Sequence, residues 1–148
     1  MTSISLSERS DIERACERLI YLSTYLNDER KFDELVEMFT EDAQLIRPNS
    51  PGQPLTGHDA IRAAYKSRPA GVLTFHNCSD VVVTVESATT ATARSKMLVL
   101  IAGKKEGGTE PDAASVKGPT AAIFHDSFVL TAQGWKFAKR QGAFWAKP

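Results

Sequence analysis

The chain has 148 residues, 42% of them apolar, so it can bury one hydrophobic core but is short for two ordinary domains. Eighteen basic residues balance eighteen acidic ones, so no overall charge favours nucleic acid, an acidic partner or a membrane surface. No stretch has the apolar length of a signal peptide or a membrane span. We therefore predict one domain over residues 1–148, located in the cytoplasm, with no nucleic-acid or membrane partner.

The sequence offers few groups for holding a cofactor. It contains three histidines, no CxxC or HExxH spacing, and no Gly-rich phosphate-binding loop after a predicted strand. Cys16 falls in a helical pattern and Cys78 in an extended one, which favours two separate buried thiols over a disulfide. We therefore expect a protein that works without a metal or an organic cofactor.

The first part of the chain shows the periodicity of amphipathic helices. From Ser10 onward apolar residues recur every three or four positions, and Ser10 with Glu13 has the spacing of a capping box. Charged residues interrupt the apolar stripe from Asp28, so the first helix is expected to end there. A second stripe, from Phe32 to Phe39, predicts a short second helix.

The next segment mixes turn residues with short elements. Residues 40–42 indicate a turn, and residues 43–47 a brief strand that runs into the Pro-rich loop at 48–54. A third helix is predicted to open at residues 57–59.

The second half of the chain is rich in β-branched residues, which favours long strands. The predicted strands are 72–85, 89–102, 120–130 and 135–144. Residues 104–117 form a polar connection between the second and third of them. The last two strands are joined by a tight hairpin turn in which Gly134 is placed for a positive φ.

Helices that precede antiparallel strands are typical of the α+β class. We predict a strongly curved antiparallel or mixed sheet wrapped around the first helix, forming a cone whose open end is a ligand-sized cavity. The apolar outer face of such a sheet favours self-association, as a dimer or a trimer. Six apolar residues could form the walls of the cavity or serve only as core: Phe39, Leu45, Val72, Leu98, Phe124 and Phe128.

Asp28 and His76 are the candidate catalytic residues. Asp28 stands where the first helix ends, and its local sequence favours solvent because a carboxylate opposes the negative end of the helix dipole. Around His76, strand alternation places Thr74, His76 and Cys78 on one face and Phe75 on the other. His76 is then either an ordinary, partly buried histidine or a base tuned by a neighbouring carboxylate, because imidazole exchanges protons near neutral pH.

Other side chains are candidates for binding a substrate. Tyr21, Tyr25 and Tyr65 could donate their hydroxyls to a developing oxyanion, or could be ordinary amphipathic aromatics. Phe124 is expected in the cavity wall. Arg140 lies in a predicted strand, where it either reaches solvent or pairs with a pocket carboxylate.

The remaining histidines are weaker candidates. His125 and Asp126 are adjacent in a strand, so they point to opposite faces and cannot pair with each other, and one of them is expected at the pocket. His58, at a helix start, is expected to be exposed.

Several stretches, in their order and spacing, resemble the SnoaL-like proteins, which share the cone-shaped fold of nuclear transport factor 2, scytalone dehydratase and ketosteroid isomerase. The resemblance covers nearly the whole chain. Its residues are Ile20-Tyr21, Asn27-Asp28, Phe32-Asp33, 38–43 (MFTEDA), 57–61 (GHDAI), 74–76 (TFH) and 134–140 (GWKFAKR).

Within that superfamily the chain looks most like the branch that contains scytalone dehydratase and hexachlorocyclohexane dehydrochlorinase. Both are cofactor-free lyases that use an Asp and a His. The resemblance implies that Asp28 and His76 match this pair, and that Arg140 matches an arginine that lines the dehydrochlorinase pocket.

The chain also departs from these relatives. Residues 97–102 are aliphatic where scytalone dehydratase has a second active-site histidine, and Ala122 and Phe124 stand near the places of its Ser and Asn. Ser23 or Thr24 stands near the pocket lysine of the dehydrochlorinase. The resemblance therefore implies a type of chemistry but no particular substrate.

The implied reaction is an elimination, dehydration or isomerisation of a small hydrophobic or aromatic, polyketide-like molecule. His76 would take a proton from a carbon beside a leaving group or carbonyl, while Asp28 holds the imidazole in one tautomer. A second interpretation is a ketosteroid-isomerase-like or polyketide-cyclase enzyme in which Asp28 alone is the base. A third is a non-catalytic domain that binds a hydrophobic ligand or serves as an assembly subunit, like the small subunit of ring-hydroxylating dioxygenases.

Overall fold

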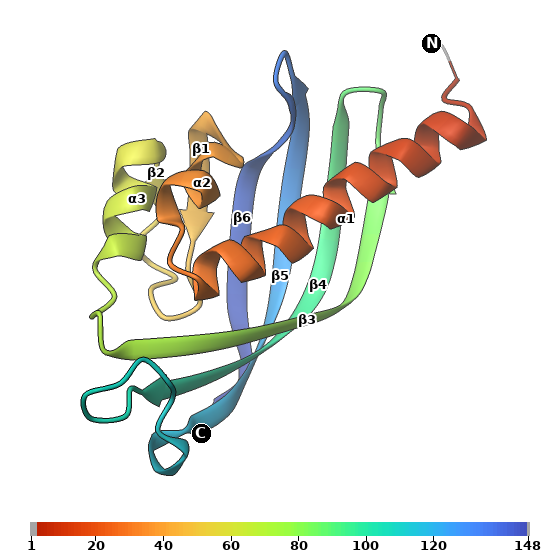
Figure 1. The fold of residues 1–148 in the computed structure, drawn as a ribbon. Helices are drawn as coiled ribbons and strands as arrows, with labels where there is room; N and C mark the ends of the chain where they lie inside the picture. Colours follow the sequence, from red (N-terminus) through yellow and green to blue (C-terminus); the bar gives the residue numbers. More distant parts are fainter. Residues whose placement is uncertain (1–2, 148) are drawn as a thin grey trace.

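The computed structural model describes residues 3–147, with helices first and strands afterwards (Figure 1). The helices are α1 (Leu6–Asp28), α2 (Phe32–Glu37) and α3 (His58–Lys66), with a short 3-10 helix η1 (Ala113–Ser115). The strands are β1 (Phe39–Ile46), β2 (Leu55–Thr56), β3 (Val72–Val85), β4 (Thr90–Gly103), β5 (Lys117–Thr131) and β6 (Gly134–Ala146). None of the helices within residues 3–147 combines the length and apolar character that crossing a bilayer requires.

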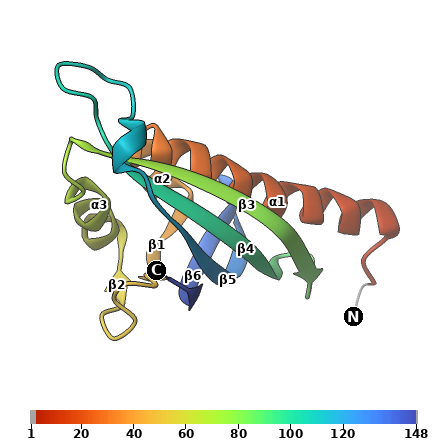
Figure 2. The ribbon, with the colours of Figure 1, turned by 90° about the horizontal axis from the view of Figure 1, so that it is seen from below.

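The strands form one mixed sheet in the order β2-β1-β6-β5-β4-β3. β1 runs parallel to β6, and the other neighbouring strands are antiparallel. In Figure 1, α1 crosses one face of the sheet diagonally, whereas α2 and α3 lie at the end that carries β1 and β2. Figure 2 shows the long β3 and β4 curving beneath α1. The predicted α+β class with a curved sheet around the first helix is confirmed.

The long strands agree closely with the sequence patterns. β3 has the predicted bounds, and the other three differ from theirs by one to three residues. Gly134 takes a φ of 103° in the hairpin between β5 and β6, the left-handed region that glycine adopts without a steric penalty. β-branched composition and alternation therefore suffice to place these strands.

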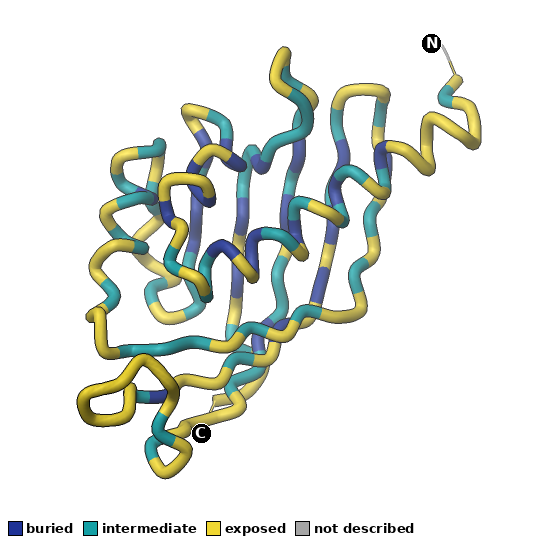
Figure 3. Tube along the Cα trace, in the orientation of Figure 1, coloured by how far each residue is buried: buried dark blue, intermediate teal, exposed yellow. Residues whose placement is uncertain are grey.

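Helix α1 starts earlier than predicted. Its N-cap is Ser5, whose hydroxyl accepts a hydrogen bond from the Glu8 amide (3.2 Å), while the Glu8 carboxylate accepts one from the Ser5 amide (2.8 Å). The prediction of a capping box at Ser10 and Glu13 is wrong. The first turns of α1 are exposed and show no apolar periodicity, so the sequence pattern becomes visible only where the helix meets the sheet (Figure 3).

Strand β1 also starts earlier than predicted. Residues 40–42 lie within β1 and do not form a turn, and the pairing of β1 with β6 is irregular between Phe39 and Gln44. The polar residues of this stretch resemble a turn in sequence because they lie at the irregularity, where the strand is exposed.

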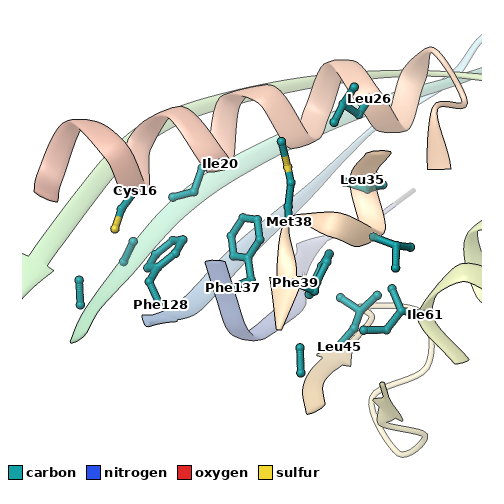
Figure 4. Packing of buried hydrophobic residues seen from close by; sticks show 14 of the residues in the cluster. Cys16, Ile20, Leu26, Leu35, Met38, Phe39, Leu45, Ile61, Phe128 and Phe137 are labelled. Carbon is teal, nitrogen blue, oxygen red and sulfur yellow. The ribbon is translucent and has the colours of Figure 1, made fainter. Parts of the chain in front are cut away.

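The core lies between α1 and the concave face of the sheet, as Figure 4 shows. Cys16 and Ile20 face it from α1, and three phenylalanine rings form its centre: Phe128 and Phe137 have centroids 5.0 Å apart, and Phe39 and Phe137 5.2 Å apart. Burying each large apolar side chain stabilises the fold by about 1.5–3 kcal/mol. Both cysteines are free, as expected.

Candidate functional site

A cavity of about 560 Å³ opens between α3, the end of β1 and the strands β3, β4 and β5. This volume lies within the range of pockets that hold small organic molecules. Its walls are largely apolar and include Leu45, Met97, Val99, Ile101, Phe124 and Phe144. Leu45 and Phe124 therefore line the cavity as predicted.

Four other predicted wall residues lie elsewhere. Phe39 and Phe128 are fully buried in the core, and Val72 does not line the cavity. Leu98 is 45% exposed because strand alternation places it on the outer face of the sheet, opposite Asn77.

The carboxylate of Asp28 and the imidazole of His76 are in direct contact. The distance between Asp28 Oδ1 and His76 Nδ1 is 2.5 Å, and the His76 amide donates to Asp28 Oδ2 (2.8 Å). The hydroxyl of Thr74 donates to Oδ1 as well (2.7 Å). The side chains of Asp28 and His76 are only 21% and 16% exposed. Three hydrogen bonds from β3 thus fix the carboxylate at the end of α1.

The orientation of Asp28 differs from what its local sequence favoured. Two arginines tie the end of α1 to the segment that precedes β3. Arg30 donates to the carbonyl of Arg68 (2.7 Å), and Arg68 donates to the side chain and the carbonyl of Asn27 (2.9 and 2.6 Å). These contacts hold the last turn of α1 against β3, so Asp28 meets its donors there rather than water.

The hydrogen bonds of Asp28 determine which nitrogen of His76 is available. An ionised carboxylate only accepts hydrogen bonds, so Nδ1 of His76 must donate to it. Nε2 has no hydrogen-bond partner within residues 3–147, and His76 lines the cavity together with Thr74. Nε2 is therefore the basic nitrogen that a molecule in the cavity would meet.

Two of the three candidate tyrosines lie away from the cavity, so their prediction as pocket residues is wrong. Tyr21 is 42% and Tyr25 66% exposed, and both border a shallow groove on the outer side of α1. Tyr25 follows the buried Cys16 by nine residues, about two and a half turns of an α-helix, which places it on the opposite face. The helical phase alone could have assigned Tyr25 to the outer face.

Tyr65 lines the cavity from α3, as predicted. Burial raises the pKa of its phenol, and the nearby arginines Arg140, Arg47 and Arg68 oppose that rise. A phenol with a raised pKa stays protonated near neutral pH and can donate a hydrogen bond into the cavity.

Arg140 is buried beneath the cavity and does not line it. Its guanidinium donates to both carboxylate oxygens of Asp126 (2.9 and 3.3 Å) and to the hydroxyl of Ser23 (2.8 Å). It also lies over the rings of Phe124 and Phe137, at 4.8 and 4.7 Å from their centroids. Arg140 therefore supports the wall residue Phe124 instead of contacting a ligand.

The other candidate residues, Asp126 and the histidines His125 and His58, also lie outside the cavity. Asp126 is buried with Arg140, and His125 is exposed, so neither lines the cavity. His58 is partly buried, and its Nε2 lies 2.8 Å from the carbonyl oxygen of Phe39, so the expectation that it is exposed is wrong.

Sequence reasoning missed several polar residues of the cavity, among them Arg47, Arg68 and Asn27. Arg47 follows the buried Leu45 by two positions, so strand alternation was the signal that could have found it. Arg68 and Asn27 are brought together by tertiary packing and leave no local pattern. Within residues 3–147, no group of three or more His, Cys, Asp or Glu side chains is arranged to hold a metal ion.

Residues 8–141 match the family model of the SnoaL-like domain. The chain belongs to the SnoaL-like family. No curated protein sequence matches this SnoaL-like chain.

Solved structures share the SnoaL-like fold over nearly its full length. A protein from Novosphingobium aromaticivorans, described as a candidate scytalone dehydratase, has a TM-score of 0.80 and 24% identity over 96% of this chain and 89% of its own. A type 2 hexachlorocyclohexane dehydrochlorinase has a TM-score of 0.77 and 17% identity over 96% and 90%. A protein from Catenulispora acidiphila, in complex with S-DNPA, has a TM-score of 0.72 and 21% identity over 91% and 94%. At these identities the likeness establishes a shared fold.

Proposed function

We propose that this SnoaL-like protein is a cofactor-free lyase, of the dehydratase or elimination type, that acts on a small hydrophobic or aromatic molecule. The observation that carries the proposal is the contact between Asp28 and His76 beside an apolar cavity. Two of the neighbours in fold are named for dehydration and dehydrochlorination, reactions that remove a proton from carbon. That likeness supports the proposal without identifying the substrate.

The proposed mechanism starts with proton abstraction by His76. Nε2 takes a proton from a carbon next to a carbonyl or leaving group, and the electron pair of that C–H bond forms the new double bond as the leaving group departs. Asp28 stabilises the imidazolium that results and keeps Nδ1 protonated throughout. In a dehydration, the imidazolium returns its proton to the departing hydroxide and releases water. Tyr65, which lines the cavity, would donate a hydrogen bond to a developing oxyanion.

The same geometry argues against Asp28 alone as the base. Its carboxylate already accepts three hydrogen bonds, and Asp28 is absent from the residues that line the cavity. A ketosteroid-isomerase-like or polyketide-cyclase mechanism with Asp28 as base would require the carboxylate to leave these donors.

Proton abstraction can be tested without knowing the natural substrate. A panel of apolar cyclic ketones and β-hydroxyketones is incubated in D2O, and deuterium uptake and elimination are followed by NMR. We expect activity in the wild type, a loss of about 10²-fold to 10⁴-fold in His76→Gln, and a clear loss in Asp28→Asn. The control is Arg94→Gln, since Arg94 is exposed and absent from the cavity.

Other outcomes would favour the rival functions. Activity that survives His76→Gln but disappears in Asp28→Asn would indicate Asp28 as the base. Tight binding of panel members with no exchange or elimination in the wild type would indicate a ligand-binding domain or an assembly subunit.

We also infer self-association of this protein in a cytoplasmic setting. Phe75 and Leu98 are exposed on the outer face of the sheet, and Leu100 pairs with Phe75 across β3 and β4. A second or third copy would cover this apolar surface. Sedimentation equilibrium of the wild type and of Phe75→Lys tests this directly, with a dimer or trimer expected for the wild type and a shift toward monomer for the variant.

A further inference from the structure

Arg47 is a cation in the cavity wall that the proposed proton transfer does not use. It follows the last residue of β1, on the same face of the chain as the buried Ala43 and Leu45. Both Leu45 and Arg47 line the cavity. The backbone thus directs the guanidinium toward the space that a substrate would occupy.

The guanidinium of Arg47 lacks the partners that a charge in such a place usually has. Its Nε is buried without a hydrogen-bond acceptor, and no hydrogen bond or ion pair joins its side chain to another residue within 3–147. By contrast, the buried Arg140 donates to Asp126 and Ser23. An arginine presents up to five donors, and leaving a buried donor unpaired is unfavourable. An unpaired buried donor calls for an explanation, and an acceptor carried by a ligand in the cavity would supply one.

The charge of the cavity wall points in the same direction. Among residues 3–147, no Asp or Glu lines the cavity, while Arg68 does so together with Arg47. Arg68 donates to Asn27, a neutral partner, and its Nε is also buried without an acceptor. Asp28, the carboxylate behind His76, already accepts three hydrogen bonds. The cavity therefore combines apolar walls with positive charge that no lining carboxylate balances.

We propose that Arg47 determines substrate specificity by binding the carboxylate of an otherwise apolar substrate in this cavity. A guanidinium pairs with a carboxylate through two parallel hydrogen bonds, which supply the acceptor that Nε lacks. The apolar body of the same molecule would lie against Phe124 and the aliphatic wall, beside His76. The role of Arg47 in turnover rests on the proposed function, whereas its capacity to bind a carboxylate does not.

The test compares two probes of nearly equal size and shape, 1-naphthoate and 1-naphthamide. Their binding to the wild-type protein at pH 8 is measured by isothermal titration calorimetry. We expect naphthoate to bind roughly 10-fold to 100-fold more tightly, the range for one hydrogen-bonded charge pair. Arg47→Gln should abolish this preference, and Arg47→Lys should retain part of it. Arg94→Gln removes the same charge from an exposed position and should leave the preference unchanged.

His76→Gln separates this test from that of the proposed function. If Arg47 is the carboxylate ligand, naphthoate keeps its advantage in His76→Gln even though proton transfer is lost. Three results would overturn the assignment: equal binding of the two probes by the wild type, a preference that survives Arg47→Gln, or no binding of naphthoate at millimolar concentration. The wild-type comparison remains decisive even if Arg47→Gln folds poorly.

Discussion

Replacing Asp28 by alanine should destabilise the protein, even though Asp28 belongs to the proposed proton-transfer pair. The substitution removes the acceptor of three hydrogen bonds, one from Thr74 and two from His76. The outcome is not obvious in advance, because a partly buried carboxylate carries a desolvation cost that its removal relieves.

The structure indicates which effect is larger. Hydrogen bonds to a charged group contribute about 1.5–3 kcal/mol each, but the Asp28 side chain is 21% exposed and the Thr74 hydroxyl can turn to another acceptor. The His76 amide and Nδ1 would both lose their acceptor. We therefore expect Asp28→Ala to lower the free energy of unfolding by about 2–4 kcal/mol, and Asp28→Asn by less, because its amide oxygen still accepts.

Urea denaturation measures this change. With a slope of about 2 kcal/mol/M, the midpoint should fall by about 1–2 M in Asp28→Ala. Asp11→Ala is the matched control, since Asp11 is an exposed residue of the same helix and should change stability by no more than about 0.5 kcal/mol. A loss of less than about 0.5 kcal/mol in Asp28→Ala, or a gain, would refute the view that β3 holds this carboxylate through stabilising bonds.

Three further predictions concern the core and the cavity wall. Burial raises the pKa of the Cys16 thiol to about 12, so its thiolate fraction at pH 8 falls to roughly one in 10⁴. In a Cys78→Ser variant, which removes the other, partly buried free thiol, Ellman's reagent should label Cys16 only after unfolding, and rapid labelling of the native variant would contradict this. Asp126→Ala leaves the buried guanidinium of Arg140 unpaired and should cost about 3–5 kcal/mol in urea denaturation, and a cost under 1 kcal/mol would show that the pair is not needed. A Cβ at Gly142 would lie 2.6 Å from the ring of Phe124. Gly142→Ala should therefore displace that ring, destabilise the protein by about 1–3 kcal/mol and change ligand affinity. Unchanged affinity and stability would contradict the contact.

The sequence predicted the elements whose patterns are local. Alternation and β-branched content placed β3 at its observed bounds and put Thr74 and His76 on one face, and both residues line the cavity. The exposed turns at the start of α1 were missed because a polar helix surface has no apolar periodicity to detect.

The parts of the site that depend on packing could not be predicted locally. The sequence around Asp28 favoured solvent, and the contacts that Arg30 and Arg68 make at the end of α1 bring the carboxylate to β3. Arg140 was expected at the cavity, but the Asp126 carboxylate beneath the wall binds it instead. Asn27 and Arg68 lie 41 residues apart in the sequence, whereas Asp126 faces Arg140 across the hairpin of β5 and β6, so that pairing depends on the strand register.

The state of the His76 ring tests the central claim most directly. Its two ring nitrogens can be distinguished by their 15N chemical shifts in a long-range proton–nitrogen NMR spectrum recorded above neutral pH. We predict a neutral ring with the proton on Nδ1, held by Asp28, and a free lone pair on Nε2. The 15N chemical shift of Nε2 should change when a ligand enters the cavity. A ring protonated on Nε2, or one whose tautomer is unchanged in Asp28→Ala, which removes the acceptor of Nδ1, would contradict the assignment of this pair to proton transfer.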